Sequence, residues 1–408
     1  MITEQMPSVR SVSLGLWVGT GSREETPKQS GISHFIEHMV FKGTKRRTAE
    51  QIAREMDSLG GGLDAFTSKE IVSFNVKVLD EHLPQAFDIV CDMVRNPLFA
   101  NDEIEKEKGV ILEELKMEVD NPEYQIHEMF SRRFWKGHAL GQSILGTRHT
   151  IRSFDRASIS RYYRSFYRPS NLLVTAAGSL RHRELAQLAT DHLGDLKPRA
   201  FRPKPSTPTP HAPLVLRDRP TLEQVHVYVG VPAIPMPHKD RFAFYVLNNI
   251  LGGGMSSRLF QNIREKLGLA YAVYSELSLY RDAGCMLIYA GTASKWAKKV
   301  IHLIVGELDQ IASHKVDEEE LRRTKDHLKG SIVLGLESTS SRMANLARQE
   351  TYLTKFMSLD EMIERVEAVT ADQVQSLAQQ FFDPKGMGVA MLGPLGGVKL
   401  SRQDLRVR

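Results

Sequence analysis

The chain has only two cysteines among its 408 residues, Cys91 and Cys285, and they lie in different halves. One falls in an apolar helical pattern and the other in an apolar, strand-like run. We therefore expect two buried free thiols rather than a disulfide, which favours a reducing compartment.

Long apolar runs and a strong charge imbalance are absent as well. No apolar run approaches the roughly 18 residues that would indicate a transmembrane helix, and the N-terminus has no secretory signal pattern. The 54 Lys and Arg residues and 49 Asp and Glu residues are interspersed and leave a net charge of +5. No basic stripe with interleaved aromatic residues is found, so we expect neither a membrane span nor nucleic-acid binding, whose mark would be salt-dependent affinity.

One stretch, residues 31–44, combines the pattern of a buried helix with residue types that bind metals. Its apolar residues recur every three or four positions, which is typical of one buried helix face: Ile32, Phe35, Ile36, Met39 and Val40. His34 and His38 are one helical turn apart, and Glu37 projects about 60° from His34 around the axis. Two imidazoles can bind one Zn²⁺ while the carboxylate accepts a proton from water. The alternative is an ordinary helix that carries two histidines.

The order His-x-x-Glu-His is the inverzincin signature, which requires a third ligand from elsewhere in the chain. A helix predicted to begin at Asn101 supplies many carboxylates: Glu103, Glu105, Glu107, Glu113, Glu114 and Glu118. Glu107 and Glu114 are seven residues apart and share nearly one face, so one could coordinate the metal while the other supports the site. Spacing alone does not choose between Glu113 and Glu114.

The second half of the chain repeats the order of elements in the first. Residues 167–178 weakly resemble residues 382–393, which indicates an internal duplication with a period of about 213 to 215 residues. A shift of 213 places His34, Glu37 and His38 on Leu247, Ile250 and Leu251, so the second copy lacks metal ligands. Six prolines within 197–213 predict a linker between domains at 1–196 and 214–408.

Periodicity and turn residues predict the main elements. Strands are expected at 12–21, 63–67, 71–79, 171–178, 224–231, 284–291 and 388–393. Helices are expected at 48–59, 81–95, 157–167, 183–193, 240–251, 256–266, 296–313, 317–338 and 371–382. Two more are expected between these: one that begins at 101, and another that follows the turn at 121–122 and ends at about 135.

With these motifs in order, the chain resembles the pitrilysin family of zinc peptidases, which includes insulin-degrading enzyme and the catalytic subunit of mitochondrial processing peptidase. The resemblance covers nearly the whole chain and rests on three segments: His34–Thr44, Glu107–Glu114 and Arg264–Tyr271. It implies an α+β fold of two duplicated domains, each a mostly antiparallel sheet covered by helices. The size is similar to that of short bacterial members, so a bacterial cytoplasm is the expected location; an organelle matrix is the alternative if an upstream targeting segment is missing.

The resemblance also implies a role for each matching residue. The ligands of one Zn²⁺ per chain would be His34, His38 and Glu114. Glu37 would be the general base, and Glu107 would support the site.

The remaining matches imply how substrate is held. Arg264 and Tyr271 would contact substrate, and the Tyr271 phenol would also stabilise the oxyanion. Residues 63–67 would pair with an extended peptide through Asp64, Ala65 and Phe66. Asp64 stands where relatives often have Asn.

These implications lead to an expected function. The chain would be a zinc endopeptidase that cleaves unstructured peptides or presequence-like segments inside a chamber formed by dimerisation. A homodimer is expected, with a heterodimer containing a metal-free homologue as the alternative. The competing function is that of a non-catalytic family member acting as a partner or core subunit.

Overall fold

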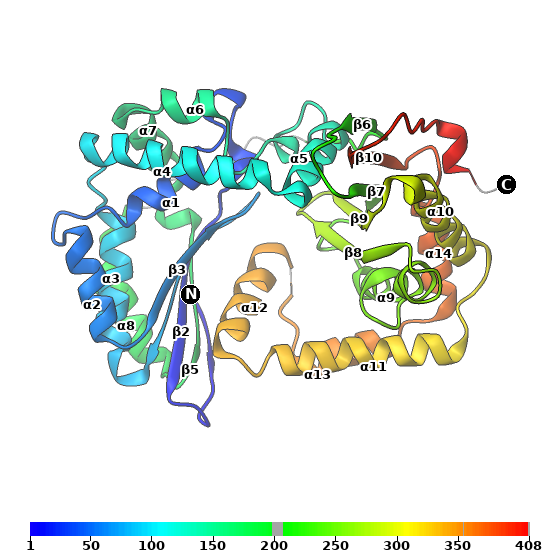
Figure 1. Ribbon diagram of the computed structural model, residues 1–408. Helices are drawn as coiled ribbons and strands as arrows, with labels where there is room; N and C mark the ends of the chain where they lie inside the picture. The colour runs from blue at the N-terminus through cyan, green and yellow to red at the C-terminus, as the bar shows by residue number, and fades with distance from the viewer. Residues whose placement is uncertain (198–206, 354, 407–408) are drawn as a thin grey trace. The chain divides into compact units, whose positions relative to one another are not determined.

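The computed structural model describes residues 1–197, 207–353 and 355–406, which form two compact units, each built on a five-stranded sheet (Figure 1). Residues 198–206 of the expected linker lie outside the described part. Unit 1 comprises Met1–Met117, Gln142–Pro205 and Leu334–Lys355. Unit 2 comprises Glu118–Gly141, Ser206–Val333 and Phe356–Arg408.

The two sheets have the same topology. The unit 1 sheet is ordered β1 (Ile2–Gln5), β5 (Leu172–Gly178), β2 (Ser11–Val18), β4 (Val72–Leu79) and β3 (Gly62–Thr67). The unit 2 sheet is ordered β6 (Leu214–Asp218), β10 (Gly388–Gly393), β7 (Val225–Ala233), β9 (Gly284–Thr292) and β8 (Ala270–Leu279). In each sheet only the first pair is parallel. This repeated, mostly antiparallel arrangement confirms the predicted fold class and the duplication.

Helices cover both faces of each sheet (Figure 1). Those of unit 1 are α1 (Ile32–Val40), α2 (Ala49–Ser58), α3 (Leu83–Arg95), most of α4 (Asn101–Asp120), α6 (Arg148–Ser153), α7 (Arg156–Phe166), α8 (His182–Leu193) and α12 (Thr339–Tyr352). Those of unit 2 are α5 (Pro122–Phe134), α9 (Arg241–Gly252), α10 (Ala297–Ser313), most of α11 (Glu318–Gly335), α13 (Leu359–Glu367) and α14 (Ala371–Phe381).

The halves of the chain exchange one helix each. Helix α5 comes from the first half but packs in unit 2, where Phe130 lies over Gly230 of β7. Helix α12 comes from the second half but packs in unit 1, where Met343 lies over Gly15 of β2. A Cβ atom would lie 2.2 Å from Phe130 at Gly230 and 2.5 Å from Met343 at Gly15. Glycine at these equivalent positions therefore lets each exchanged helix approach its sheet closely.

Some elements were not predicted from sequence. Strands β6 and β8 and helices α12 and α13 had no assigned pattern, and the helix expected at 256–266 contains a π-helical segment, Phe260–Glu265. The sequence-based domain boundaries treated each half as one contiguous stretch, whereas each unit contains the helix exchanged from the other half.

Cys91 and Cys285 are free and buried, as expected. Within the described residues, no helix is both long enough and apolar enough to cross a bilayer.

Candidate metal centre

Helix α1 forms as its sequence pattern predicts. Ile32, Phe35, Ile36, Met39 and Val40 are all 0% exposed, so the periodic apolar face is buried in the core of unit 1. The preceding residue, Gly31, has φ +93°, a left-handed conformation that favours glycine. The buried face fixes the rotation of α1 and turns its two histidines toward α4.

Helix α4 supplies the carboxylates. Its buried positions, Ile104, Glu107, Ile111 and Leu115, follow helical spacing, so a glutamate occupies the face that packs on the core. Glu114 is one position before Leu115 and lies at the edge of this face. Glu113 is exposed and pairs with Lys116 at 2.5 Å. The structure therefore separates the two candidates that spacing left open.

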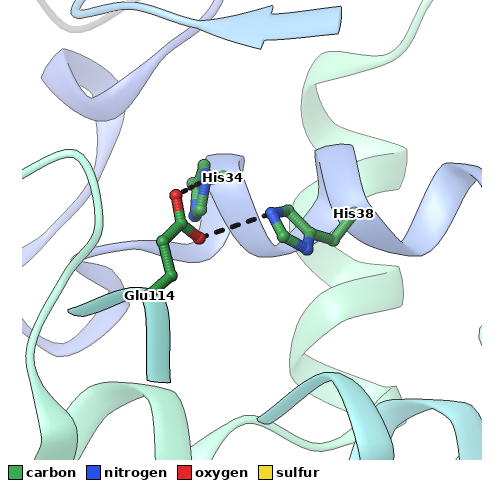
Figure 2. A group of neighbouring side chains, drawn as sticks. All are labelled: His34, His38 and Glu114. Carbon is green, nitrogen blue, oxygen red and sulfur yellow. Dashed lines mark ion pairs between the residues drawn. The ribbon is translucent and has the colours of Figure 1, made fainter. Parts of the chain in front are cut away.

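The two helices bring His34, His38 and Glu114 together, as Figure 2 shows. Nε2 of His34 lies 3.6 Å from Oε1 of Glu114, and Nε2 of His38 lies 3.6 Å from the other oxygen, Oε2. One ligand atom from each of the three residues lies within 4.8 Å of the other two. Tetrahedral zinc ligands at about 2.0–2.1 Å from the ion are separated by about 3.4 Å, so this donor set suits Zn²⁺.

Glu107 lies behind His38. Its Oε2 is 3.0 Å from Nδ1 of His38, on the ring edge opposite Nε2. Its other oxygen, Oε1, is 2.6 Å from Nζ of Lys42, which offsets the charge of this buried carboxylate. This contact fixes the tautomer of His38 and leaves Nε2 available as a ligand.

The environment of His34 differs. The residue is 7% exposed, and burial together with the neighbouring His38 lowers the pKa of its imidazole from 6.5 to about 3. Its Nδ1 is buried and has no hydrogen-bond partner among the described residues. His34 is therefore a neutral imidazole at physiological pH, the form that binds metals, but no hydrogen bond orients its ring.

Glu37 projects from α1 beside the three converging residues. Thr67, the last residue of β3, donates a hydrogen bond from Oγ1 to Oε2 of Glu37 at 2.5 Å. Burial raises the pKa of the Glu37 carboxyl, and the charges of Glu114 and Asp64 add to this effect, against the opposing influence of Thr67 and His38. A carboxylate with a raised pKa is suited to take up and release a proton.

Strand β3 carries the residues expected to contact substrate. It pairs with β4 on one side only and is the edge of its sheet among the described strands. Asp64 and Phe66 are exposed, whereas Ala65 points to the opposite face of the sheet and is half-buried. The free main-chain groups of this edge can pair with an extended peptide.

Arg264 and Tyr271 lie in unit 2, whereas the three converging residues lie in unit 1. The guanidinium of Arg264 stacks between two rings, 4.7 Å from the centroid of Phe260 and 5.3 Å from that of Tyr271. Tyr271 is 77% exposed, so its phenol is accessible to a ligand.

Sequence reasoning missed two contacts of the site. Lys42 was not identified as a site residue, although its position four residues after His38 could have indicated a shared face. Thr67 was included in the 63–67 strand, but no local pattern pairs it with Glu37.

Comparisons with known proteins agree with this architecture. Residues 1–148 match the family described as Insulinase (Peptidase family M16), and residues 153–328 match the Peptidase M16 inactive domain. An uncharacterized zinc protease of Bacillus subtilis is 38% identical over 398 residues, which cover 98% of this chain and 97% of the relative. An uncharacterized zinc protease of Streptomyces coelicolor is 39% identical over 410 residues, covering 98% and 89%, respectively.

Solved structures give the same fold. A protease from Helicobacter pylori superposes with a TM-score of 0.89 at 22% identity, covering 96% of both chains. A structure titled as a peptidase M16 inactive domain from Pseudomonas fluorescens superposes with a TM-score of 0.90 at 20% identity, covering 96% of this chain and 95% of the other.

Proposed function

Because the chain belongs to peptidase family M16, we propose that it is a zinc-dependent endopeptidase that hydrolyses unstructured peptides or presequence-like segments. The observation that carries this proposal is the convergence of His34, His38 and Glu114 within 4.8 Å, with Glu37 beside them. The donor set of two imidazoles and one carboxylate leaves a fourth position for water or substrate, as catalytic zinc sites require.

The residues present fit the metal and divide the chemistry among them. His34, His38 and Glu114 would hold one Zn²⁺, which when bound supplies a Lewis acid for activating water and polarising a carbonyl. Glu37 takes a proton from the attacking water and transfers it to the leaving amine, so water is added across the peptide bond. Glu107 keeps His38 in the ligating tautomer, and Thr67 orients the Glu37 carboxylate.

Substrate binding would use main-chain pairing and two residues of unit 2. The edge of β3, with Asp64, Ala65 and Phe66, pairs with an extended peptide, which selects for unstructured chains. Arg264 anchors a peptide carbonyl, and Tyr271 donates a hydrogen bond to the oxyanion. The exposure of the Tyr271 side chain, 77%, supports such a role.

We further propose a homodimer in which Arg264 and Tyr271 of one subunit serve the ligand set of the other. The resemblance to the pitrilysin family implies that substrate is enclosed between two bowl-shaped halves. This chain has the length of one such half. A heterodimer with a metal-free homologue is the alternative. The buried free thiols support a reducing compartment, and the bacterial relatives support a bacterial cytoplasm as that compartment.

Glu37→Gln tests the proposed chemistry. This variant should lower kcat on an unstructured peptide by about 10²- to 10⁴-fold, because the amide cannot accept the proton, while bound zinc remains at one per chain. Glu113→Gln, at an exposed position of α4, is the matched control and should cleave at the normal rate. Cleavage by Glu37→Gln at the normal rate would contradict the mechanism.

Mixing two inactive variants tests the shared site. Glu37→Gln and Arg264→Ala chains should each be inactive alone, and the mixture should recover part of the activity. A mixture that stays inactive although its chains co-assemble, or a fully active monomer, would exclude action between subunits.

The competing function is a non-catalytic partner or core subunit. The intact set His34, Glu37, His38 and Glu114 argues against it, since inactive relatives commonly lose ligands. A non-catalytic chain would cleave no unstructured peptide at any zinc concentration.

A further inference from the structure

The loop before α1 contains a buried carboxylate, Glu25, that the proposed chemistry does not use. Glu25 is 4% exposed. Its Oε2 accepts a hydrogen bond from the backbone N–H of Gly31 at 2.7 Å, and its Oε1 accepts one from the N–H of Ser33 at 2.8 Å. One carboxylate therefore binds two of the backbone donors that the start of a helix leaves unpaired.

His34 directly follows Ser33 in the chain. Its Nδ1 has no hydrogen-bond partner among the described residues, whereas Nδ1 of His38 is held by Glu107. Since no hydrogen bond from the described residues holds Nδ1 of His34, the orientation of its ring depends on packing and on the backbone that carries it. Glu25 holds that backbone at the residue before His34.

The backbone here has little room to shift. At Gly31, whose φ is +93°, an added Cβ would lie 2.8 Å from Cα of Gly146 and 2.8 Å from the carbonyl oxygen of Leu145. The side chain of Ser33 is also fixed, because its Oγ lies 2.9 Å from the hydroxyl of the buried Tyr162.

The segment that presents Glu25 is itself held in place. Arg23 donates a hydrogen bond from Nη1 to Oε1 of Glu70 at 2.7 Å, and both side chains are 3% exposed. The N–H of Ser22 and the N–H of Arg23 bind the carbonyl oxygens of Ser68 and Lys69 at 3.2 and 2.8 Å. A continuous set of buried contacts thus links the chain after β3, through residues 22–25, to the start of α1.

We propose that Glu25 is a positioning residue for the zinc site: its carboxylate holds the first turn of α1 so that Nε2 of His34 faces Glu114. The proposal rests on the proposed zinc site, and it concerns metal affinity rather than the peptidase reaction.

Zinc affinity, measured by competition with a chromogenic chelator, tests this role without any substrate. Glu25→Gln keeps the shape of the side chain but replaces one of the two accepting oxygens with an NH2 group, and we expect zinc to bind about 10-fold more weakly, as for other residues that orient a ligand. Glu25→Asp keeps both carboxyl oxygens on a shorter side chain, and its zinc affinity should lie between those of the unaltered chain and of Glu25→Gln. Glu320→Gln makes the same substitution at a carboxylate that pairs with Arg258 at 2.6 Å in unit 2, and it should bind zinc normally.

Circular dichroism and thermal unfolding show whether each variant is folded. A folded Glu25→Gln variant that binds zinc within about twofold of the unaltered chain would overturn the proposal, and if Glu25→Gln does not fold, unchanged affinity of Glu25→Asp would do so. Zinc binding by the unaltered chain without peptide cleavage would instead refute the proposed function and leave the role of Glu25 intact. An unaltered chain that binds no zinc would overturn both.

Discussion

The Nδ1 atom of His38 lies 3.0 Å from Oε2 of Glu107, a carboxylate that is only 3% exposed. The contact joins two helices, α1 and α4, and its two residues are 69 positions apart in the chain. It gives one of the two imidazoles a fixed tautomer and orientation before any metal binds.

Glu107→Gln should therefore weaken zinc binding by about 10- to 100-fold, because an amide accepts a hydrogen bond less strongly and does not favour the ligating form of His38. The measurement is the zinc dissociation constant by chelator competition. Glu105→Gln, on the same helix but exposed and paired with Lys108, is the control and should not change it. Equal affinities for the two variants would show that the Glu107 contact does not support the site.

Thr67 donates a hydrogen bond to Glu37, the proposed general base, so its hydroxyl should affect turnover rather than metal content. Thr67→Val removes the 2.5 Å hydrogen bond to Glu37 at nearly constant volume, and we expect kcat to fall about 10-fold with zinc content unchanged. Thr67→Ser keeps the hydroxyl and should retain most of the activity. If Thr67→Val turns over normally, Glu37 does not depend on this contact.

Arg47 follows α1 and supports unit 1 through a network of carboxylates. It pairs with Asp88 at 2.5 Å, with Glu55 at 2.9 Å and with Asp92 at 3.0 Å, and the Asp92 side chain is 0% exposed. Arg47→Met leaves buried charge unpaired and should lower the free energy of unfolding by about 3–5 kcal/mol.

The neighbouring Arg46 provides the control for this prediction. Its side chain is 55% exposed and pairs only with Asp88 among the contacts of the described residues. Arg46→Met should cost at most about 1 kcal/mol. Similar losses in the two variants, measured by urea denaturation, would contradict the role assigned to the buried network.

His226 of β7 predicts a pH dependence in unit 2. Burial lowers the pKa of its imidazole, against a smaller opposing effect of Glu123, and Nδ1 lies 2.8 Å from the hydroxyl of Tyr289. Since the unfolded chain takes up the proton more readily, the free energy of unfolding should fall as the pH drops below about 6.5. His226→Gln should reduce this slope between pH 7 and 5, and an unchanged slope would show that other groups cause it.

Helix α1 and its two histidines could be predicted from sequence because both the apolar spacing and the histidine spacing are local patterns. The apolar spacing from Ile32 to Val40 sets the buried face, and the same spacing puts His34 and His38 on a common side. The choice of carboxylate on α4 was less certain, because it depends on how the helix is rotated about its axis. That rotation decides between Glu113 and Glu114, and it is set by packing against segments that are distant in the chain. The structure separates them, with Glu113 exposed and paired with Lys116.

Features that depend on distant segments could not be predicted. Helix α12 has a weak apolar pattern, and it is buried only because it packs on the sheet of the other half, where Gly15 makes room for Met343. Strand β8 was missed because its apolar and polar residues do not alternate regularly. The pairing of Glu25 with the start of α1 likewise has no signal in the sequence around it.

Zinc titration of the metal-free chain tests the central claim most directly. Protein stripped by a chelator is mixed with increasing zinc, and the initial rate of cleavage of an unstructured peptide is followed. Activity should be absent at first, rise in proportion to zinc and saturate at one zinc per chain, with no recovery in a His34→Ala variant. Cleavage that persists in the stripped protein, or a zinc-saturated chain that cleaves nothing, would contradict a zinc peptidase built on His34, His38 and Glu114.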